Sequence, residues 1–431
     1  MSSVKAVLAG ALIDGTGAEP VKDAVVVFEG KSIVAAGRAS GVDVPKGAEV
    51  TDCRDLTLMP GLIEAHCHPN GERSLEEGFR KYYDNVVSST YLPIFKGIEV
   101  LRTMLRWGYT TCRILHGAIP SAPEMRGEHL VAMRTAAERR YFPSPRIVAA
   151  GTVFPSAGHM HLMAPPSLIS SAWAGADGVD EVRKQTRLCL DHNVDVVKLL
   201  GPTGGGGGGL DGPKVQGMTY DEIRVAVEEA HFKGVPVAAH AHGGSGLKAA
   251  VEAGVDSIEH GTYLCEEPEL LRMMAKNRQI LVPTVGLRIH PKYGWWEAAK
   301  KGIPTKEKSE EELDAIECSF KSVRMAKREG VRVAAGTDFM RYDISPLAYE
   351  LEVYHRYCGL TAMEALVAGT KTAAEACNLR RTGTIEAGKT SDLIAVAGDP
   401  LKDITVLQRM DAIRHVWKEG YHEVRDGRIN W

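Results

Sequence analysis

The sequence has no two cysteines in a C-x-x-C spacing, although it contains eight cysteines in all. They are scattered singly along the chain rather than grouped at short intervals. This distribution is typical of reduced thiols in a cytosolic enzyme and argues against a disulfide framework. We therefore expect a cytoplasmic protein.

Long hydrophobic runs are absent as well, and none approaches the roughly 18 residues needed to span a bilayer. The apolar residues 6–13 could pass for a short signal segment. However, the turn-forming residues 14–17 follow at once and no A-x-A cleavage site is present. A β-hairpin is the better interpretation, and no membrane partner is expected.

No long block of charge of one sign occurs, and the formal net charge is only -3. This balance argues against nucleic acid or an anionic membrane surface as the main partner. With 44% hydrophobic and 25% charged residues, the composition is that of an ordinary globular protein. The 431 residues leave room for one large catalytic domain and a smaller one.

Both ends of the chain carry short apolar segments bounded by turn-forming residues. Such segments are typical of β-strands. The predicted strands are residues 25–28, 32–36, 48–50, 392–396 and 412–417. We predict one small β-sandwich domain built from both termini, comprising residues 1–57 and 380–431.

The middle of the chain, residues 58–379, alternates strand and helix patterns. Helical stretches such as 219–233 and 309–328 repeat apolar residues at i, i+3 and i+4, and a capping-box pattern begins at Ser309. The predicted strands are residues 58–68, 110–115, 146–151, 194–200, 236–241, 257–261, 279–285 and 331–338. This alternation predicts an α/β fold, a (β/α)8 TIM barrel, with its active site at the carboxyl ends of the strands. A doubly wound open sheet is the alternative, but it would not gather residues from so many strands around one point.

The triplet His66-Cys67-His68 ends the first predicted barrel strand. Side chains at i and i+2 of a strand point to the same face, so the two imidazoles stand side by side. Two neutral imidazoles in this arrangement are suited to a divalent metal. A His-x-His triplet alone is weak evidence, and its weight depends on donor groups elsewhere.

Further donor groups stand near the ends of four other predicted strands: Lys198, His240, His260 and Asp338. Nitrogen and oxygen donors of this kind suit zinc or another first-row divalent ion. Each residue alone has an ordinary explanation, as a hydrogen-bonded core histidine, a salt-bridged lysine or a helix N-cap. Such a coincidence on five strands, always at the same end, is a poor explanation of the whole set.

Lys198 needs a chemical change before it can bind a cation, because an ammonium group has no lone pair. Burial and neighbouring cations favour the neutral amine, which carbon dioxide can convert to a carbamate. That carbamate could bridge two ions. Six converging donors fit two divalent metals better than one.

These motifs resemble those of the amidohydrolase superfamily, in particular the branch of imidazolonepropionases and prolidase-like dipeptidases. The similarity covers nearly the whole length. The matching segments are residues 11–17, 60–63, 108–111, 240–243, 259–261, 336–338, 372–376 and 383–389. Where Ser391 stands, the family usually has alanine, a departure that touches nothing catalytic.

The resemblance implies a ligand for every metal-binding position. His66, His68 and Asp338 would hold one metal, His240 and His260 the other, and carboxylated Lys198 would bridge them. Zinc is the expected metal, and relatives are commonly homo-oligomers. A water shared by two such metals loses its proton near neutral pH. Asp338 is then the expected catalytic acid/base, taking that proton and passing it to the leaving nitrogen.

Four other residues are candidates for substrate contact. His159 and His161 follow the third barrel strand, where relatives carry a glycine-histidine that contacts the bound carbonyl or acyl group. His242 shares a strand face with His240, and a role in orienting the ligands is equally open to it. Arg288 follows the seventh strand and could capture a carboxylate, although a solvated surface position is the simpler interpretation. The glycine-rich residues 204–209 lack the Gly-Lys-Ser/Thr ending of a phosphate loop. They are therefore interpreted as a mobile flap over the barrel mouth or as a flexible insertion without a function.

Three functions remain open at this point. The first is hydrolysis of a C–N bond in a small apolar or aromatic amide, carbamate or urea. The second is a prolidase-like dipeptidase or N-acyl amino acid hydrolase, which needs a grip on a free carboxylate. The third is a catalytically inactive scaffold, but such proteins typically lose metal ligands and none is missing here.

Overall fold

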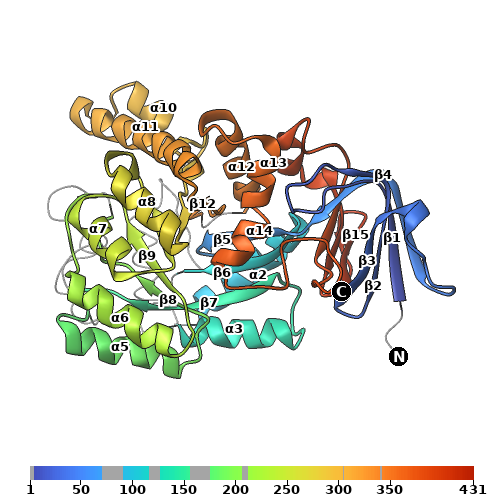
Figure 1. The fold of residues 1–431 in the computed structure, drawn as a ribbon, viewed down its shortest axis with the longest axis horizontal. Helices are drawn as coiled ribbons and strands as arrows, with labels where there is room; N and C mark the ends of the chain where they lie inside the picture. The colour runs from blue at the N-terminus through green and yellow to red at the C-terminus, as the bar shows by residue number, and fades with distance from the viewer. Residues whose placement is uncertain are drawn as a thin grey trace.

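The computed structural model describes residues 4–69, 91–115, 127–155, 175–205, 212–303, 305–339 and 342–431. Its named strands form two sheets of eight strands each. Figure 1 shows the larger unit, with its helices, on the left and a small β domain on the right, which holds both chain ends.

The small β domain is a mixed sheet of strands from both termini, as the sequence predicts. Its order is β16-β15-β14-β13-β4-β1-β2-β3. The two halves of the chain meet where β13 pairs antiparallel with β4, for example Ile394 with Met59. The strands are β1 Val4–Leu12, β2 Val21–Glu29, β3 Ser32–Arg38, β4 Glu49–Pro60, β13 Leu393–Val396, β14 Ile413–Lys418, β15 Tyr421–Arg425 and β16 Arg428–Ile429.

The second sheet runs in sequence order from β5 to β12, with all neighbours parallel. Its ends are joined: the Ala65 amide donates to Ala335 O at 3.0 Å and the Asp338 amide to His66 O at 2.8 Å. The predicted (β/α)8 barrel is therefore confirmed. Its strands are β5 Leu62–Cys67, β6 Tyr109–Ile114, β7 Arg146–Val153, β8 Val196–Leu199, β9 Val237–Ala241, β10 Ser257–His260, β11 Ile280–Val282 and β12 Arg332–Val333.

Helices surround the barrel sheet. The described α-helices are α2 Leu92–Arg106, α3 Glu128–Glu138, α5 Val179–Asp191, α6 Tyr220–Phe232, α7 Gly244–Ala253, α8 Pro268–Asn277, α9 Gly286–Ile289, α10 Trp296–Lys300, α11 Lys306–Glu329, α12 Pro346–Tyr357, α13 Ala362–Ala368 and α14 Lys371–Ala376. Short 3₁₀ helices lie at η1 Ala39–Gly41, η3 Leu264–Glu266, η4 Ile404–Gln408 and η5 Met410–Ala412. No described helix has both the length and the apolar character that crossing a membrane requires.

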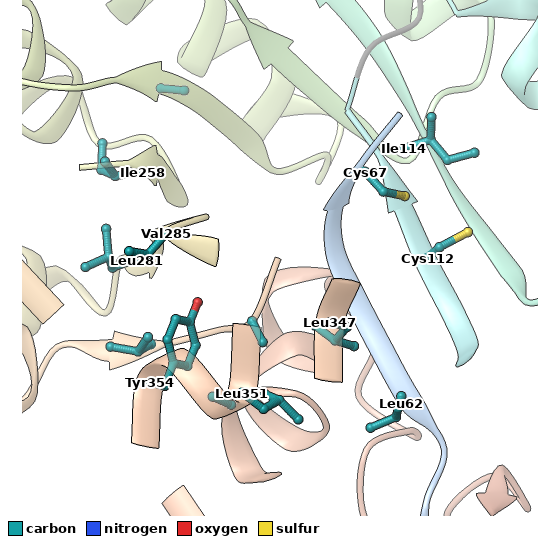
Figure 2. Close-up of a cluster of buried hydrophobic side chains, with 14 of the residues drawn as sticks. Leu62, Cys67, Cys112, Ile114, Ile258, Leu281, Val285, Leu347, Leu351 and Tyr354 are labelled. Carbon is teal, nitrogen blue, oxygen red and sulfur yellow. The ribbon is translucent and has the colours of Figure 1, made fainter. Parts of the chain in front are cut away.

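The barrel core is made of apolar side chains from strands and helices that are far apart in sequence. Figure 2 shows Leu62 and Cys67 of β5 beside Cys112 and Ile114 of β6, and Leu347 of α12 nearby. All five are fully buried. Burial of such side chains contributes roughly 1.5–3 kcal/mol each. All eight cysteines are free, in agreement with the sequence-based expectation of reduced thiols.

A cluster of buried and partly buried charged side chains connects the small domain to the barrel. Arg146 at the start of β7 donates to Asp392 at 2.8 Å and to Glu419 at 3.0 Å. Lys418 of β14 reaches across to Ser144 O at 2.7 Å. These contacts hold the amino end of the barrel, the side opposite the predicted site.

Two details of the sequence-based prediction were wrong. Residues 58–60 belong to β4 of the small domain, because Leu58 pairs there with Leu12 and Ala395, and the barrel strand begins only at Leu62. Helix α11 begins at Lys306 rather than Ser309, since the Thr305 side chain accepts the Lys308 amide and caps it. The other helix that was predicted by its bounds, α6, begins as expected with a capping box at Thr219. The proposed domain boundaries stay a prediction.

Candidate metal centre

The end of β5 and the segment after β12 bring three predicted ligands together. Asp338 Oδ1 lies 2.9 Å from His68 Nε2 and 3.6 Å from His66 Nε2. One ligand atom from each residue lies within 4.8 Å of the others. The three donors can therefore share one divalent ion.

A second set, His240, His242 and His260, comes from the ends of β9 and β10. Their ligand atoms also lie within 4.8 Å of one another. The His240 and His260 ring centroids are 4.5 Å apart, and those of His242 and His260 are 4.7 Å apart. The His260 ring lies 5.2 Å from that of His66, so the two sets adjoin.

Lys198 of β8 is completely buried, and among the described residues its Nζ has no hydrogen-bond partner. Burial lowers the pKa of this amine to about 8, with Arg113 acting in the same direction and Glu259 and Asp338 opposing it. Its charge also depresses the pKa of both His66 and His260, which places it beside both ligand sets. An orphaned, readily neutralised amine at this position suits conversion to a carbamate better than a role as a structural cation.

Burial favours the neutral, metal-binding form of two of the imidazoles, His66 and His260. Burial lowers the pKa of His66 to about 4 and that of His260 well below its usual value. Neutral imidazole and ionised carboxylate are the protonation states that bind zinc and similar ions. The donor set thus fits two divalent metals.

The backbone is strained at these ligands. His260 and Asp338 have φ values of 74° and 57°, in the left-handed region that non-glycine residues rarely adopt. Residues in such conformations cost of order 1–3 kcal/mol and cluster at functional sites. Gly336 permits the close approach of strands here, because a Cβ would lie only 2.7 Å from the His66 Cβ.

Polar residues behind the ligands hold the imidazoles in orientation, and the sequence analysis gave them no role. His66 Nδ1 donates to Glu259 Oε2 at 2.7 Å, and Arg113 donates to Glu259 Oε1 at 2.8 Å. His260 Nδ1 bonds Thr284 Oγ1 and His242 Nδ1 bonds Thr262 Oγ1, each at 2.7 Å. In His66 and His260 these bonds occupy Nδ1 and so direct Nε2 towards a metal. The signal in the sequence for Glu259 was its place directly before the predicted ligand His260 at the end of a strand.

We expect Glu259→Gln to weaken metal binding by about 10- to 100-fold, because the amide orients His66 less strongly than the carboxylate does. Competition with a chromophoric chelator measures this affinity. Exposed Glu269 of α8, paired with Arg272, gives the matched control Glu269→Gln. Unchanged metal affinity in Glu259→Gln would show that the carboxylate does not position His66.

Glu259 also makes the free energy of unfolding depend on pH. Burial alone would raise its pKa, but Arg113 and His66 outweigh this and lower the pKa to about 2 from 4.5. The unfolded chain therefore takes up a proton before the folded one does, and the stabilisation present above pH 4.5 is lost as the pH falls towards 2. The wild-type melting temperature should decline more steeply over this range than that of Glu259→Gln.

Three other predicted site residues, Arg288, His159 and His161, are not among the residues brought together here. Arg288, proposed to capture a carboxylate, donates Nη1 to both Glu312 oxygens at 2.8 and 2.9 Å, so its charge is already partly balanced. His159 and His161 lie outside the described residues, as do residues 206–209 of the glycine-rich segment. Gly204 is described, and its carbonyl lies 3.3 Å from His240 Nε2.

Comparisons with known proteins show the family of this chain. The family model described as "Amidohydrolase family" matches residues 57–422. Ochratoxinase from Aspergillus niger is 31% identical over 441 residues, covering 97% of this chain and 86% of its own. Its crystal structure gives a TM-score of 0.84 at 26% identity, with 98% of this chain and 96% of that chain covered.

A crystal structure of a Xaa-Pro dipeptidase with bound methionine gives a TM-score of 0.81 at 26% identity, covering 97% of this chain and 99% of that one. Imidazolonepropionase from Rhizobium rhizogenes is 24% identical over 398 residues, covering 88% of this chain and 87% of its own. The family model spans most of the chain, and one relative exceeds 30% identity over 97% of this chain. The chain therefore belongs to the amidohydrolase family and is a hydrolase acting on carbon–nitrogen bonds.

Proposed function

We propose that the protein is a two-metal hydrolase that cleaves the C–N bond of a small apolar or aromatic amide, carbamate or urea. This proposal is carried by two adjoining ligand sets together with a buried Lys198 Nζ that has no hydrogen-bond partner in the described part of the barrel. His66, His68 and Asp338 would hold one ion, His240 and His260 the other, and the Lys198 carbamate would bridge them. Zinc suits these nitrogen and oxygen donors.

When bound, divalent ions supply Lewis acidity and lower the pKa of water. Asp338 supplies the proton transfer: its carboxylate takes the proton of the attacking water and returns it to the leaving nitrogen. Its side chain is 19% exposed, against 2% for His66 and 11% for His68. Asp338 is thus the member of its set best able to reach a substrate, while Glu259 keeps His66 fixed from behind.

His242 is assigned to the substrate rather than to a metal. Lys198 supplies the further ligand that His240 and His260 need, and His242 Nδ1 is held by Thr262. We assign the ring of His242 to contact with the carbonyl of the bond to be cleaved. His159 and His161 keep their predicted substrate roles.

A chemical screen tests the proposal. Metal-reconstituted protein is offered aromatic amides without a carboxylate, phenylureas and carbamates, and dipeptides of the leucine-proline type. We expect hydrolysis in the first two groups and its loss after treatment with a chelator. A protein that binds two metals and hydrolyses none of these compounds would overturn the proposal.

A prolidase-like dipeptidase is the second candidate, supported by the likeness to the Xaa-Pro dipeptidase structure. Such an enzyme needs a cation or tyrosine to hold the free carboxylate of its substrate. Arg288 was the nominated residue, and its pairing with Glu312 makes it a poorer clamp. Activity confined to substrates with a free carboxylate would decide for this candidate against the first.

A further inference from the structure

Four aromatic side chains pack together near the carboxyl end of the barrel, and we refer to them as the His290 cluster: His290, Tyr293, Phe339 and Tyr349. The His290 ring lies 4.7 Å from Tyr349, 5.1 Å from Tyr293 and 5.9 Å from Phe339, measured between centroids. The Tyr293 ring is stacked on His290, whereas the other two meet it edge-on.

The cluster adjoins the metal ligands through the backbone. Phe339 directly follows Asp338, and its carbonyl accepts the His68 amide at 3.2 Å. His290 follows α9, and three residues separate α9 from the end of β11. Because the carboxyl ends of all barrel strands meet at one rim, the segments that carry His290 and Asp338 lie on the same side of the barrel.

Hydrogen bonds define the tautomer of His290. Its Nδ1 accepts the backbone amides of Lys292 and Tyr293, at 3.2 and 3.3 Å. A neutral imidazole that accepts at Nδ1 carries its proton on Nε2. Partial burial lowers the pKa of His290, which favours this neutral form. Nε2–H has no hydrogen-bond partner among the residues that the structure describes, and it is available as a neutral donor.

The charges around the cluster are balanced within the protein. Lys292 pairs with Asp343 at 3.2 Å, and the Tyr293 hydroxyl donates to the same carboxylate. Arg288 pairs with Glu312. Phe339 is buried, whereas His290, Tyr293 and Tyr349 are partly exposed. The cluster therefore offers the partly exposed rings and one neutral N–H donor, which suits an uncharged aromatic group more than a free carboxylate.

We propose that the His290 cluster is the subsite for the aromatic part of the substrate, and that His290 Nε2–H donates a hydrogen bond to an oxygen of that part. This rests on the proposed function and narrows it to amides with an aromatic acyl group. Ring-to-ring contact provides the preference for aromatic over aliphatic groups, and the hydrogen bond orients the substrate carbonyl towards Asp338. His290 is thus a positioning and specificity residue rather than a catalytic one.

The test compares benzoyl and cyclohexanecarbonyl amides of one amine in metal-loaded wild type, His290→Leu and His290→Phe. Loss of ring and donor in His290→Leu should lower kcat/KM for the benzoyl amide by about 5- to 100-fold, mainly through KM. The cyclohexanecarbonyl amide should change by less than about threefold. His290→Phe keeps a ring, so its kcat/KM for the benzoyl amide should lie between those of the wild type and His290→Leu. In His290→Phe, which lacks the N–H donor, kcat/KM should fall more for a methoxybenzoyl amide than for the methylbenzoyl amide.

His231 of α6, paired with Asp256 at 2.7 Å, provides the control His231→Leu, with unchanged kinetics expected. An equal loss of kcat/KM for the benzoyl and cyclohexanecarbonyl amides in His290→Leu would overturn the proposal, because it would indicate a merely structural role. No loss for either amide would overturn it as well.

Calorimetric titration of the metal-loaded proteins with benzamide and cyclohexanecarboxamide separates this inference from the proposed function. Wild type should bind benzamide more tightly, and His290→Leu should lose that preference, whether or not any amide is hydrolysed. An absence of preference in the wild type would overturn the subsite even if hydrolysis is found.

Discussion

Asp338→Asn should lower turnover by about 10²- to 10⁴-fold, which is the usual contribution of a positioned acid/base group. The amide keeps the shape and one oxygen donor of the carboxylate, so most of the metal should remain bound. It cannot, however, take a proton from water and return it to the leaving nitrogen. Elemental analysis of the purified variant and kcat on an accepted amide measure the two effects separately.

The control for this variant is Asp314→Asn, which changes an exposed carboxylate on α11 and should leave both turnover and metal content unchanged. Turnover like that of the wild type in Asp338→Asn would refute the acid/base role. Loss of metal together with activity would instead make Asp338 mainly a ligand, and would require the proton to be carried by another group.

Lys198→Met should reduce the bound metal below two ions per chain and lower turnover by about 10³-fold or more, because both ions lose their bridging ligand. The fold should survive, since methionine fills a similar volume and removes a buried amine that has no hydrogen-bond partner in the described structure. Metal analysis and thermal unfolding distinguish these outcomes. A native mass spectrum of the wild type should show an increase equal to one carbon dioxide.

Lys418→Met is the matched control, because Lys418 is also a buried lysine but bonds Ser144 O at the far side of the barrel. This variant should lose stability and keep its metals, the reverse of Lys198→Met. Two ions and normal turnover in Lys198→Met would rule out the bridging carbamate.

Much of the architecture could be predicted from local patterns. Alternating apolar strands and amphipathic helices have distinct periods along the chain, and their regular succession predicted the barrel. Metal-type donors at the strand ends then had to lie at one rim, because parallel strands end together there. His66, His68 and Asp338, and separately His240 and His260, do come together in this way.

Other features depended on contacts that local patterns do not encode. The first barrel strand begins later than predicted, because residues before it pair with the sheet of the small domain. Leu58, for example, pairs with Ala395 and not with a barrel strand. The start of helix α11 is different, because its signal is local: Thr305 caps the Lys308 amide, and the helix begins at Lys306. Arg288 had the chemistry of a carboxylate clamp, but its bound partner Glu312 lies 24 positions further along the chain.

The sequence by itself determined the fold class, the two-part organisation and the donor types at the catalytic rim, since each follows from residue order and side-chain chemistry. Only the tertiary structure decided which partners those donors have. Glu259 meets His66 from 193 positions away, and His290 meets Phe339 from another strand end. Such pairings follow from strand order, register and barrel closure, which bring distant residues together through the geometry of the whole fold.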